Sequence, residues 1–176
     1  MIDNEFAYQL GIELDLTYLT DLILNKDVPK IGLAGHQRLV ADDPYMLSIK
    51  EKFPFLSPYY NVYKNRPKTS IVLHTDAKRN CALNIPICNT RESSTIFYTL
   101  IGNPVFEYNA RDILNEVKSP ANEVFKFTLT TPTLINNTIP HAVEHWGTGV
   151  RTIISWSVEQ TMLYSTAKDL FKQVGY

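Results

Sequence analysis

The sequence predicts a mainly β protein of the α+β class, in which an antiparallel sandwich or barrel carries N-terminal helices packed on one sheet. Two observations support this prediction. From residue 59 onward, short segments rich in β-branched and aromatic residues are separated by loops rich in Pro, Asn, Gly and Ser. Helical patterns do not alternate regularly with these segments, as they would in a parallel α/β sheet.

Two helices are expected before the strands. Asp15 is a good N-cap for a helix that extends to about Asn25, because apolar residues recur there at helical spacing. A second helix is expected over Asp43–Pro54, with a capping aspartate, a proline in the first turn and a second proline that ends it. Pro29 and Gly32–Gly35 indicate a loop between the two helices.

The expected strands are Tyr59–Tyr63, Ser70–His74, Ala82–Cys88, Thr95–Ile101, Val105–Tyr108, Val124–Thr130, Thr133–Asn136, His141–Trp146 and Thr152–Val158. Residues Asn109–Lys118 are expected to form a short helical or irregular insertion, and Ser165–Val174 a closing helix. The length indicates one domain, 1–176, with helical cover in 1–58, the β core in 59–158 and a C-terminal helix in 159–176.

The composition is that of an ordinary globular protein, with 44% apolar and 20% charged residues. A formal net charge of −1 gives no basic footprint, so nucleic acid is not an expected partner. No apolar run has the length of a membrane span, and the N-terminus does not resemble a signal peptide. Cys81 and Cys88 indicate neither a disulfide framework nor a metal knuckle. We therefore expect a soluble protein of the reducing cytoplasm.

Residues 139–156 are expected to form a strand, a tight turn and a returning strand. Gly147-Thr148-Gly149 would make the turn, because glycine tolerates the positive φ that hairpin turns require. Arg151 would then lie opposite His145 and share one face with His141, about four strand steps or roughly 13 Å away. That gap has room for a metal ion and a small dicarboxylate.

A candidate metal site begins with His74-Thr75-Asp76 at the end of an expected strand. Residues two apart on a strand face the same way, so an imidazole and a carboxylate can converge there on one ion. With His141 they make two histidines and one carboxylate, which leaves open positions as a mononuclear iron(II) oxygenase requires. A surface ion pair within His-x-Asp is the simpler alternative. The order of the parts, with Arg151 ten residues after His141, favours the metal site.

In these residues the chain resembles the iron(II)/2-oxoglutarate-dependent dioxygenases, especially the aspartyl/asparaginyl β-hydroxylase-like and prolyl-hydroxylase-like branches. The resemblance covers roughly Tyr59 to Val158. It is carried by His74-Thr75-Asp76, Ala82–Ile87, Ile139–Val143 and Arg151–Ser155. The fold that it implies for the β core is a double-stranded β-helix, which is a jelly roll of the cupin-like kind.

The resemblance implies that His74, Asp76 and His141 bind Fe(II) and that Arg151 holds the distal carboxylate of the cosubstrate 2-oxoglutarate. A guanidinium fork matches a carboxylate, whereas a lysine offers only a point charge. With O2, such an enzyme would hydroxylate a C–H bond of an amino-acid side chain, free or in a peptide or protein, and release succinate and CO2. Asp, Asn and Pro side chains are the first candidate substrates.

Three further residues are predicted to bind 2-oxoglutarate: Asn84, Ser155 and Tyr98. If the apolar residues of 83–87 pack outward under the helices, Asn84 faces the interior. Its amide could donate to the C1 carboxylate or be a satisfied structural amide, and the resembled hydroxylases have an arginine near this position. Ser155 shares the inferred face of the arginine. Tyr98 and Tyr63 could donate a hydroxyl group or pack in the core.

Other polar residues near the expected site have simpler interpretations. Arg79 and Arg91 lie on loops beside the metal end, where solvated surface arginines are expected, although both could meet an acidic group of a substrate. His36 is expected in a solvated loop. His145 could replace His141 as a metal ligand, but the ten-residue step to the arginine favours His141.

Two other functions are compatible with the sequence. A cupin-like metal-binding protein, such as an isomerase or a small-molecule binder, would use the same three ligands without oxygenase activity. Such a ligand set also holds Zn(II), Mn(II) or Ni(II). A catalytically silent interaction module is disfavoured, because His74, Asp76, His141 and Arg151 are all present.

Overall fold

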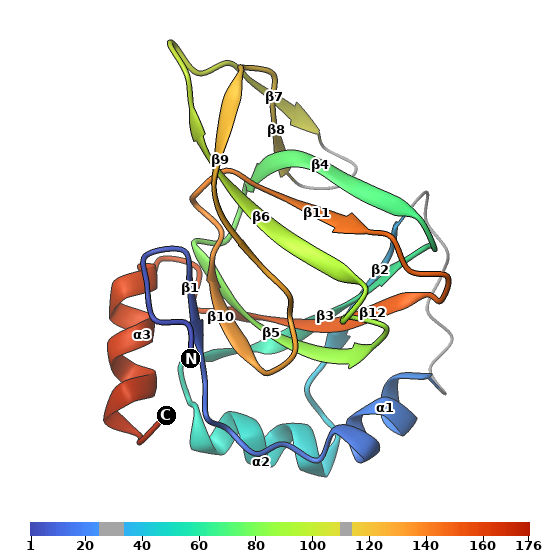
Figure 1. Cartoon of the computed structure of the whole chain (residues 1–176). Helices are drawn as coiled ribbons and strands as arrows, with labels where there is room; N and C mark the ends of the chain where they lie inside the picture. The colour runs from blue at the N-terminus through green and yellow to red at the C-terminus, as the bar shows by residue number, and fades with distance from the viewer. Residues whose placement is uncertain (25–33, 110–113) are drawn as a thin grey trace.

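The computed structural model describes residues 1–24, 34–109 and 114–176, and its strands form two six-stranded antiparallel sheets (Figure 1). The covered sheet, on which the helices pack, comprises in spatial order β1 (Ala7–Gln9), β10 (Thr133–Asn136), β5 (Cys81–Cys88), β12 (Arg151–Val158), β3 (Leu56–Asn65) and β2 (Ala34–Val40). The open sheet comprises β7 (Phe106–Asn109), β8 (Leu114–Val117), β4 (Thr69–Asp76), β11 (His141–His145), β6 (Ser93–Leu100) and β9 (Ala121–Phe127). The helices are α1 (Leu16–Leu24), α2 (Pro44–Lys52) and α3 (Tyr164–Gln173).

The chain alternates between the two sheets through its central part. From β3 to β6 each strand lies in the sheet opposite to its predecessor, and the same holds from β10 to β12. This path is that of a jelly roll. The predicted fold class, a mainly β jelly roll with helices packed on one sheet, is confirmed.

The helices begin at the capping residues that the sequence indicates. The carboxylate of Asp15 accepts a hydrogen bond of 2.9 Å from the backbone N–H of Tyr18. Asp43 accepts in the same way from Tyr45, and a proline follows it in the first turn of α2. No helix in the described part of the chain combines the length and the apolar character that a membrane crossing requires.

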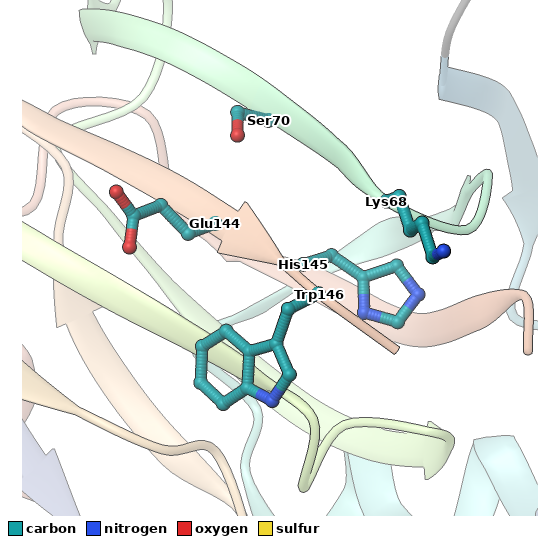
Figure 2. A pocket seen from close by; sticks show the side chains of 5 residues that line it. All are labelled: Lys68, Ser70, Glu144, His145 and Trp146. Carbon is teal, nitrogen blue, oxygen red and sulfur yellow. The ribbon is translucent and has the colours of Figure 1, made fainter. Parts of the chain in front are cut away.

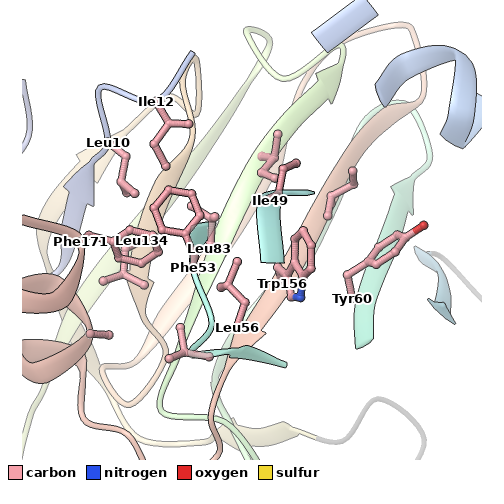
Figure 3. Packing of buried hydrophobic residues seen from close by; sticks show 14 of the residues in the cluster. Leu10, Ile12, Ile49, Phe53, Leu56, Tyr60, Leu83, Leu134, Trp156 and Phe171 are labelled. Atoms are coloured by element: carbon pink, nitrogen blue, oxygen red, sulfur yellow. The ribbon is translucent and has the colours of Figure 1, made fainter. Parts of the chain in front are cut away.

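The larger hydrophobic core lies between the covered sheet and the helices (Figure 3). Trp156 is fully buried there, packs with Tyr60 at 5.8 Å between ring centroids and donates its indole N–H to the Ser57 carbonyl. Ile154 belongs to the same core, whereas Ile153 faces the space between the sheets. This alternation along β12 is the one that the sequence predicts.

A second, smaller hydrophobic cluster lies between the two sheets and borders the candidate site. Its buried members are Ala7, Phe97, Phe127, Leu129, Ile135 and Ile153. All of them except Leu129 lie on strands, and these strands belong to both sheets, so the cluster joins the sheets. The ring of Phe97 lies 5.7 Å, centroid to centroid, from that of His141.

The prediction of a hairpin over residues 139–156 is wrong. β11 pairs with β4 and β6 in the open sheet, whereas β12 pairs with β3 and β5 in the covered sheet, so their connection crosses between sheets. Neither Gly147 nor Gly149 has a positive φ. A Cβ at Gly147 would overlap the side chain of Glu92, and one at Gly149 that of Asn89. Close packing, and not turn geometry, requires glycine at these positions.

Three strands were not expected from the sequence. The segment 1–58, expected as helical cover, also supplies β1 and β2, and β2 occupies positions expected as loop. β8 lies in the second half of Asn109–Lys118, which was expected to be helical or irregular, while residues 110–113 lie outside the described residues. β1 and β2 are edge strands and β8 pairs with an edge strand, so these short segments lack the apolar alternation of a central strand. Pro29 and Gly32, in the same expected loop as β2, lie outside the described residues.

Candidate metal centre

Two neighbouring strands of the open sheet bring His74, Asp76 and His141 together. His74 and Asp76 end β4, His141 begins β11, and the two histidines are direct partners across the antiparallel pair. Their ring centroids lie 4.3 Å apart. One possible ligand atom from each of the three residues lies within 4.8 Å of the others. His74 and His141 are only 6% and 7% exposed, so the group faces the interior of the jelly roll.

A bulge in β4 aims His74 at this site. From Ile71 to His74 the strand takes three steps, whereas its partner takes two from Val143 to His141. The extra residue restores His74 to the inward face that His141 also occupies. Bulges of this kind re-aim side chains next to functional sites in other proteins.

The hydrogen bonds of both histidines involve Nδ1, so Nε2 of each ring can bind a metal. Nδ1 of His74 lies 2.7 Å from the carbonyl oxygen of Val72, and Nδ1 of His141 lies 2.9 Å from that of Ile139. A ring that donates from Nδ1 to a carbonyl carries its lone pair on Nε2. Nε2 of His74 lies 3.7 Å from Oδ1 of Asp76. Two imidazoles and a carboxylate in this arrangement fit a divalent transition-metal ion.

The electrostatics of the group suit a cation. Burial disfavours the imidazolium form and His74 adds repulsion, so the pKa of His141 falls to about 4. Burial also opposes ionisation of Asp76, but the charges of Arg79, His141 and His74 outweigh it and hold the pKa of the carboxyl below its ordinary value. At neutral pH the site therefore offers a neutral His141 and an ionised Asp76, the forms that bind metal.

Arg79 is not a solvated loop arginine, as the sequence interpretation expects. Its side chain is 18% exposed, and its Nε donates to Oδ2 of Asp76. One terminal nitrogen donates to the hydroxyl oxygen of Ser155 at 2.7 Å and the other to that of Tyr63 at 3.3 Å. The carboxylate outweighs the effect of burial and raises the pKa of Arg79. The only sequence signal for this role is the three-residue step from Asp76.

Arg151 is buried between the sheets, and its hydrogen-bond partners among the described residues are neutral. It is 2% exposed, and its guanidinium donates to the hydroxyl of Ser93 at 3.0 Å and to the amide oxygen of Asn65 at 2.9 Å. No carboxylate of the described residues forms an ion pair with it. Burial lowers the pKa of Arg151 to about 10, so it remains charged at neutral pH. Asn65 lies opposite Arg151 on the neighbouring strand, whereas the predicted hairpin placed His145 there.

The three other predicted cosubstrate ligands lie in different surroundings. Asn84 faces the interior beside Ser155 on the neighbouring strand, and its amide oxygen is buried without a hydrogen-bond partner. Ser155 is buried, and its hydroxyl accepts from Arg79. Tyr98 follows the inward-facing Phe97 and lies near the charges of three residues, Glu123, Lys126 and Glu144. No hydrogen bond or ring contact in the described part of the chain joins Tyr98 to the triad, and its role toward 2-oxoglutarate stays a prediction.

His145 and the groove beside it are separate from the triad. Its ring nitrogens lie 3.0 Å and 2.7 Å from the carbonyl oxygens of Glu92 and Gly149, so hydrogen bonds to the backbone occupy this histidine. A groove of about 390 Å³ is lined by Lys68, Ser70, Glu144, His145 and Trp146 (Figure 2). Ser70 and Glu144 are exposed strand partners, so the groove opens on the outer face of the open sheet. His36 lies in β2 opposite Tyr63 and not in the expected loop.

Comparisons with known proteins identify similar structures only. No family model matches the chain, and no curated protein matches it. Hazelnut (Corylus avellana) vicilin is 10% identical with a TM-score of 0.44, over 78% of this chain and 33% of that chain. The formate complex of Lactobacillus farciminis oxalate decarboxylase is 9% identical with a TM-score of 0.41, over 77% of this chain and 31% of that chain. The chain thus spans about a third of these two proteins, and neither of them is described as an iron(II)/2-oxoglutarate oxygenase.

Proposed function

We propose that the chain is a non-haem Fe(II), 2-oxoglutarate-dependent oxygenase that hydroxylates a C–H bond of an amino-acid side chain. The observation that carries this proposal is that the inward-facing triad of His74, Asp76 and His141 shares the jelly-roll interior with Arg151, whose guanidinium has no carboxylate partner among the described residues. A metal-binding triad alone would fit many chemistries. A buried cation that lacks a carboxylate adds a demand for an anionic ligand.

The cost of burying Arg151 supports a role in binding. A buried charge is unfavourable unless an opposite charge and hydrogen bonds compensate it, and the described residues supply only two neutral partners. A carboxylate would meet the planar guanidinium fork with two parallel hydrogen bonds. A ligand with a carboxylate at one end and a metal-chelating oxoacid at the other satisfies both parts of the interior, and 2-oxoglutarate is such a molecule.

The overall reaction consumes the side chain, 2-oxoglutarate and O2, and forms the hydroxylated side chain, succinate and CO2. Bound iron would supply the oxygen chemistry of this reaction. The work of the protein is to hold and orient: His74, Asp76 and His141 would hold the ion and Arg151 the distal carboxylate. Asn84, whose buried amide oxygen has no hydrogen-bond partner among the described residues, would contact the metal end of the cosubstrate. The aromatic cluster beside His141 would limit water near the reacting groups.

The substrate class follows from the resemblance and is part of the proposal. An Asp, Asn or Pro side chain, in a free amino acid or in a peptide or protein, is the first to test. The formal net charge of −1 does not favour nucleic acid as the substrate. The small-molecule partner is 2-oxoglutarate itself.

The proposal is tested by anaerobic titration of the metal-free protein with Fe(II) and 2-oxoglutarate. A weak visible charge-transfer band is expected when the oxoacid chelates the iron. The band should be lost in His74→Ala and Arg151→Ala and retained in Arg91→Ala, which removes an exposed arginine. Absence of the band in folded, iron-loaded wild-type protein would refute the oxygenase proposal.

The second candidate is a cupin-like metal-binding protein without oxygenase activity, such as an isomerase or a small-molecule binder. The triad favours it as much as the oxygenase, because two imidazoles and a carboxylate bind several divalent ions and later ions bind more tightly than Fe(II). The Arg151→Ala variant separates the two. Loss of 2-oxoglutarate binding supports the oxygenase, whereas unchanged small-molecule binding supports the cupin-like protein.

A further inference from the structure

We propose that Arg79 is a positioning residue for the metal centre. It holds Asp76 so that this residue binds the metal through one carboxylate oxygen, and it anchors Asp76 to the opposite sheet. This inference rests on the metal centre of the proposed function and does not depend on 2-oxoglutarate. It starts from the hydrogen bonds of Arg79, which reach Asp76, Ser155 and Tyr63.

The two oxygens of Asp76 have different neighbours. Oδ1 lies 3.7 Å from Nε2 of His74, and Oδ2 accepts the hydrogen bond from Nε of Arg79. Two ligand atoms that each lie about 2.1 Å from one ion are about 3 to 4 Å apart. Oδ1 is therefore placed to share an ion with His74, while Oδ2 is held away by the guanidinium.

Holding one oxygen keeps coordination positions open. A carboxylate with two unrestrained oxygens can rotate to bind an ion with both of them and so fill an additional position. The bond from Arg79 to Oδ2 opposes that rotation. A centre with two histidines and a one-oxygen carboxylate then retains positions for exogenous ligands, which both candidate functions need.

The position of Arg79 in the fold explains how it is fixed. Residues 77–80 connect β4 of the open sheet to β5 of the covered sheet, and Arg79 lies on this crossing. Its terminal nitrogens meet Tyr63 on β3 and Ser155 on β12, both in the covered sheet, while Nε meets Asp76 in the open sheet. A planar guanidinium donates in three directions from one rigid group, whereas a lysine ammonium reaches less far and lacks the fork.

The experiment measures Mn(II) affinity by isothermal titration calorimetry and electron paramagnetic resonance, together with the visible spectrum of the Co(II) form. Arg79→Ala is compared with wild type and with Arg91→Ala, a matched control at an exposed arginine. Loss of groups that orient a metal ligand lowers affinity about 10- to 100-fold, and we expect this for Arg79→Ala but not for Arg91→Ala. The Co(II) spectrum should also change, since the coordination by Asp76 changes.

Chemical rescue separates positioning from a structural role. Because the side chain of Arg79 is partly exposed, added guanidinium ion at a non-denaturing concentration should restore Mn(II) affinity and the Co(II) spectrum in Arg79→Ala. Should Arg79→Ala fail to fold, Arg79→Lys keeps the charge without the fork and should still show weakened binding with an altered spectrum. Ser155→Ala, which removes one anchor, should show a smaller loss that does not add to that of the Arg79 variant.

The outcomes separate this inference from the proposal on which it rests. Wild-type affinity and an unchanged Co(II) spectrum in folded Arg79 variants would overturn the positioning role while leaving the metal centre intact. If wild type fails to bind Mn(II), or if His141→Ala binds it as tightly as wild type, the metal centre itself is refuted, and this inference with it. The inference is supported if Arg79→Ala, but not Arg91→Ala, binds Mn(II) more weakly than wild type and added guanidinium ion restores its affinity.

Discussion

Replacing Arg151 with methionine should not destabilise the ligand-free protein, although this arginine is almost fully buried. Methionine preserves most of the length and apolar packing of the side chain but removes its charge and its hydrogen bonds. Buried residues normally cost stability when they are replaced. The expected exception follows from the absence of an anionic partner among the described residues.

The magnitude follows from the burial of the charge. Burial lowers the pKa of Arg151 from 12.5 to about 10, which corresponds to a cost of about 3 kcal/mol for holding the charge in the fold. Against this, the variant loses two hydrogen bonds from a charged group, to Ser93 and Asn65, worth about 1.5 kcal/mol or more each. Ser93 also donates to the carbonyl of Thr90, so its hydroxyl retains a partner. The two contributions nearly cancel, so the free energy of unfolding should stay within about 1 kcal/mol of wild type.

The assay is urea denaturation of the metal-free protein, followed by the same measurement with Mn(II) and 2-oxoglutarate. A ligand present at about 100 times its dissociation constant stabilises the folded state by about 2.7 kcal/mol. Wild type should gain this increment when 2-oxoglutarate is added to the Mn(II) form, and Arg151→Met should not. Arg151→Lys keeps the charge without the fork, so it should lack most of the response to 2-oxoglutarate.

A large loss of stability in ligand-free Arg151→Met would refute this reasoning. Breaking a buried ion pair typically costs about 3 to 5 kcal/mol, and a loss of that size would mean that Arg151 has a structural anion. A full response of the variant to 2-oxoglutarate would instead show that the cosubstrate carboxylate binds elsewhere.

Three further predictions concern stability. The pKa of His141 is about 4 in the fold and near 6.5 in the unfolded chain, so its neutral form adds to the free energy of unfolding in full above pH 6.5. This contribution is lost as the pH falls from 6.5 toward 4. Urea denaturation of the metal-free protein should show a loss of up to about 3 kcal/mol over this range, and a smaller loss in His141→Gln. Trp156→Ala, at a fully buried site, should cost about 3 to 5 kcal/mol by thermal or urea denaturation, and Trp156→Phe clearly less. Gly147→Ala should cost about 1 to 3 kcal/mol in the same assay, because the new Cβ would overlap the side chain of Glu92 and meet His145; an unchanged stability would mean that Glu92 moves freely.

The sequence was sufficient for the fold class because strand alternation survives in the central strands. Ile154 and Trp156 face the helices and Ile153 faces the interior, as the period of two predicts. The edge strands β1 and β2 escaped prediction, since one side of an edge meets water and the apolar period disappears. Their pairing depends on neighbours that are distant in sequence.

The pairing of β11 and β12 could not be obtained from local pattern. Two strands joined by a short glycine-containing connection can form a hairpin in one sheet or cross between two sheets that lie about 10 Å apart. Both arrangements turn His141 and Arg151 toward the same interior. The predicted inward faces of these two residues therefore agree with the structure even though the predicted pairing was wrong.

The role of Arg79 illustrates what a sequence does not specify. A loop arginine can reach in many directions, and its choice depends on Ser155 and Tyr63, which only the assembled sheets bring near Asp76. The predicted support of a cosubstrate carboxylate by Ser155 changes for the same reason, because its hydroxyl already accepts from Arg79. Long side chains on loops are thus the least predictable parts of such a site.

The two interior arginines differ in a way that bears on the ligand. Arg79 has its charge matched by Asp76, whereas Arg151 is matched by no carboxylate of the described residues. With His141 neutral, a divalent ion at the triad would add two further positive charges to the excess charge of Arg151. A neutral ligand would leave this excess buried, while a dianion that spans both ends would reduce it. The charge distribution therefore favours a dicarboxylate with a metal-binding end over an uncharged small molecule, which is the physical reason to test 2-oxoglutarate before other ligands.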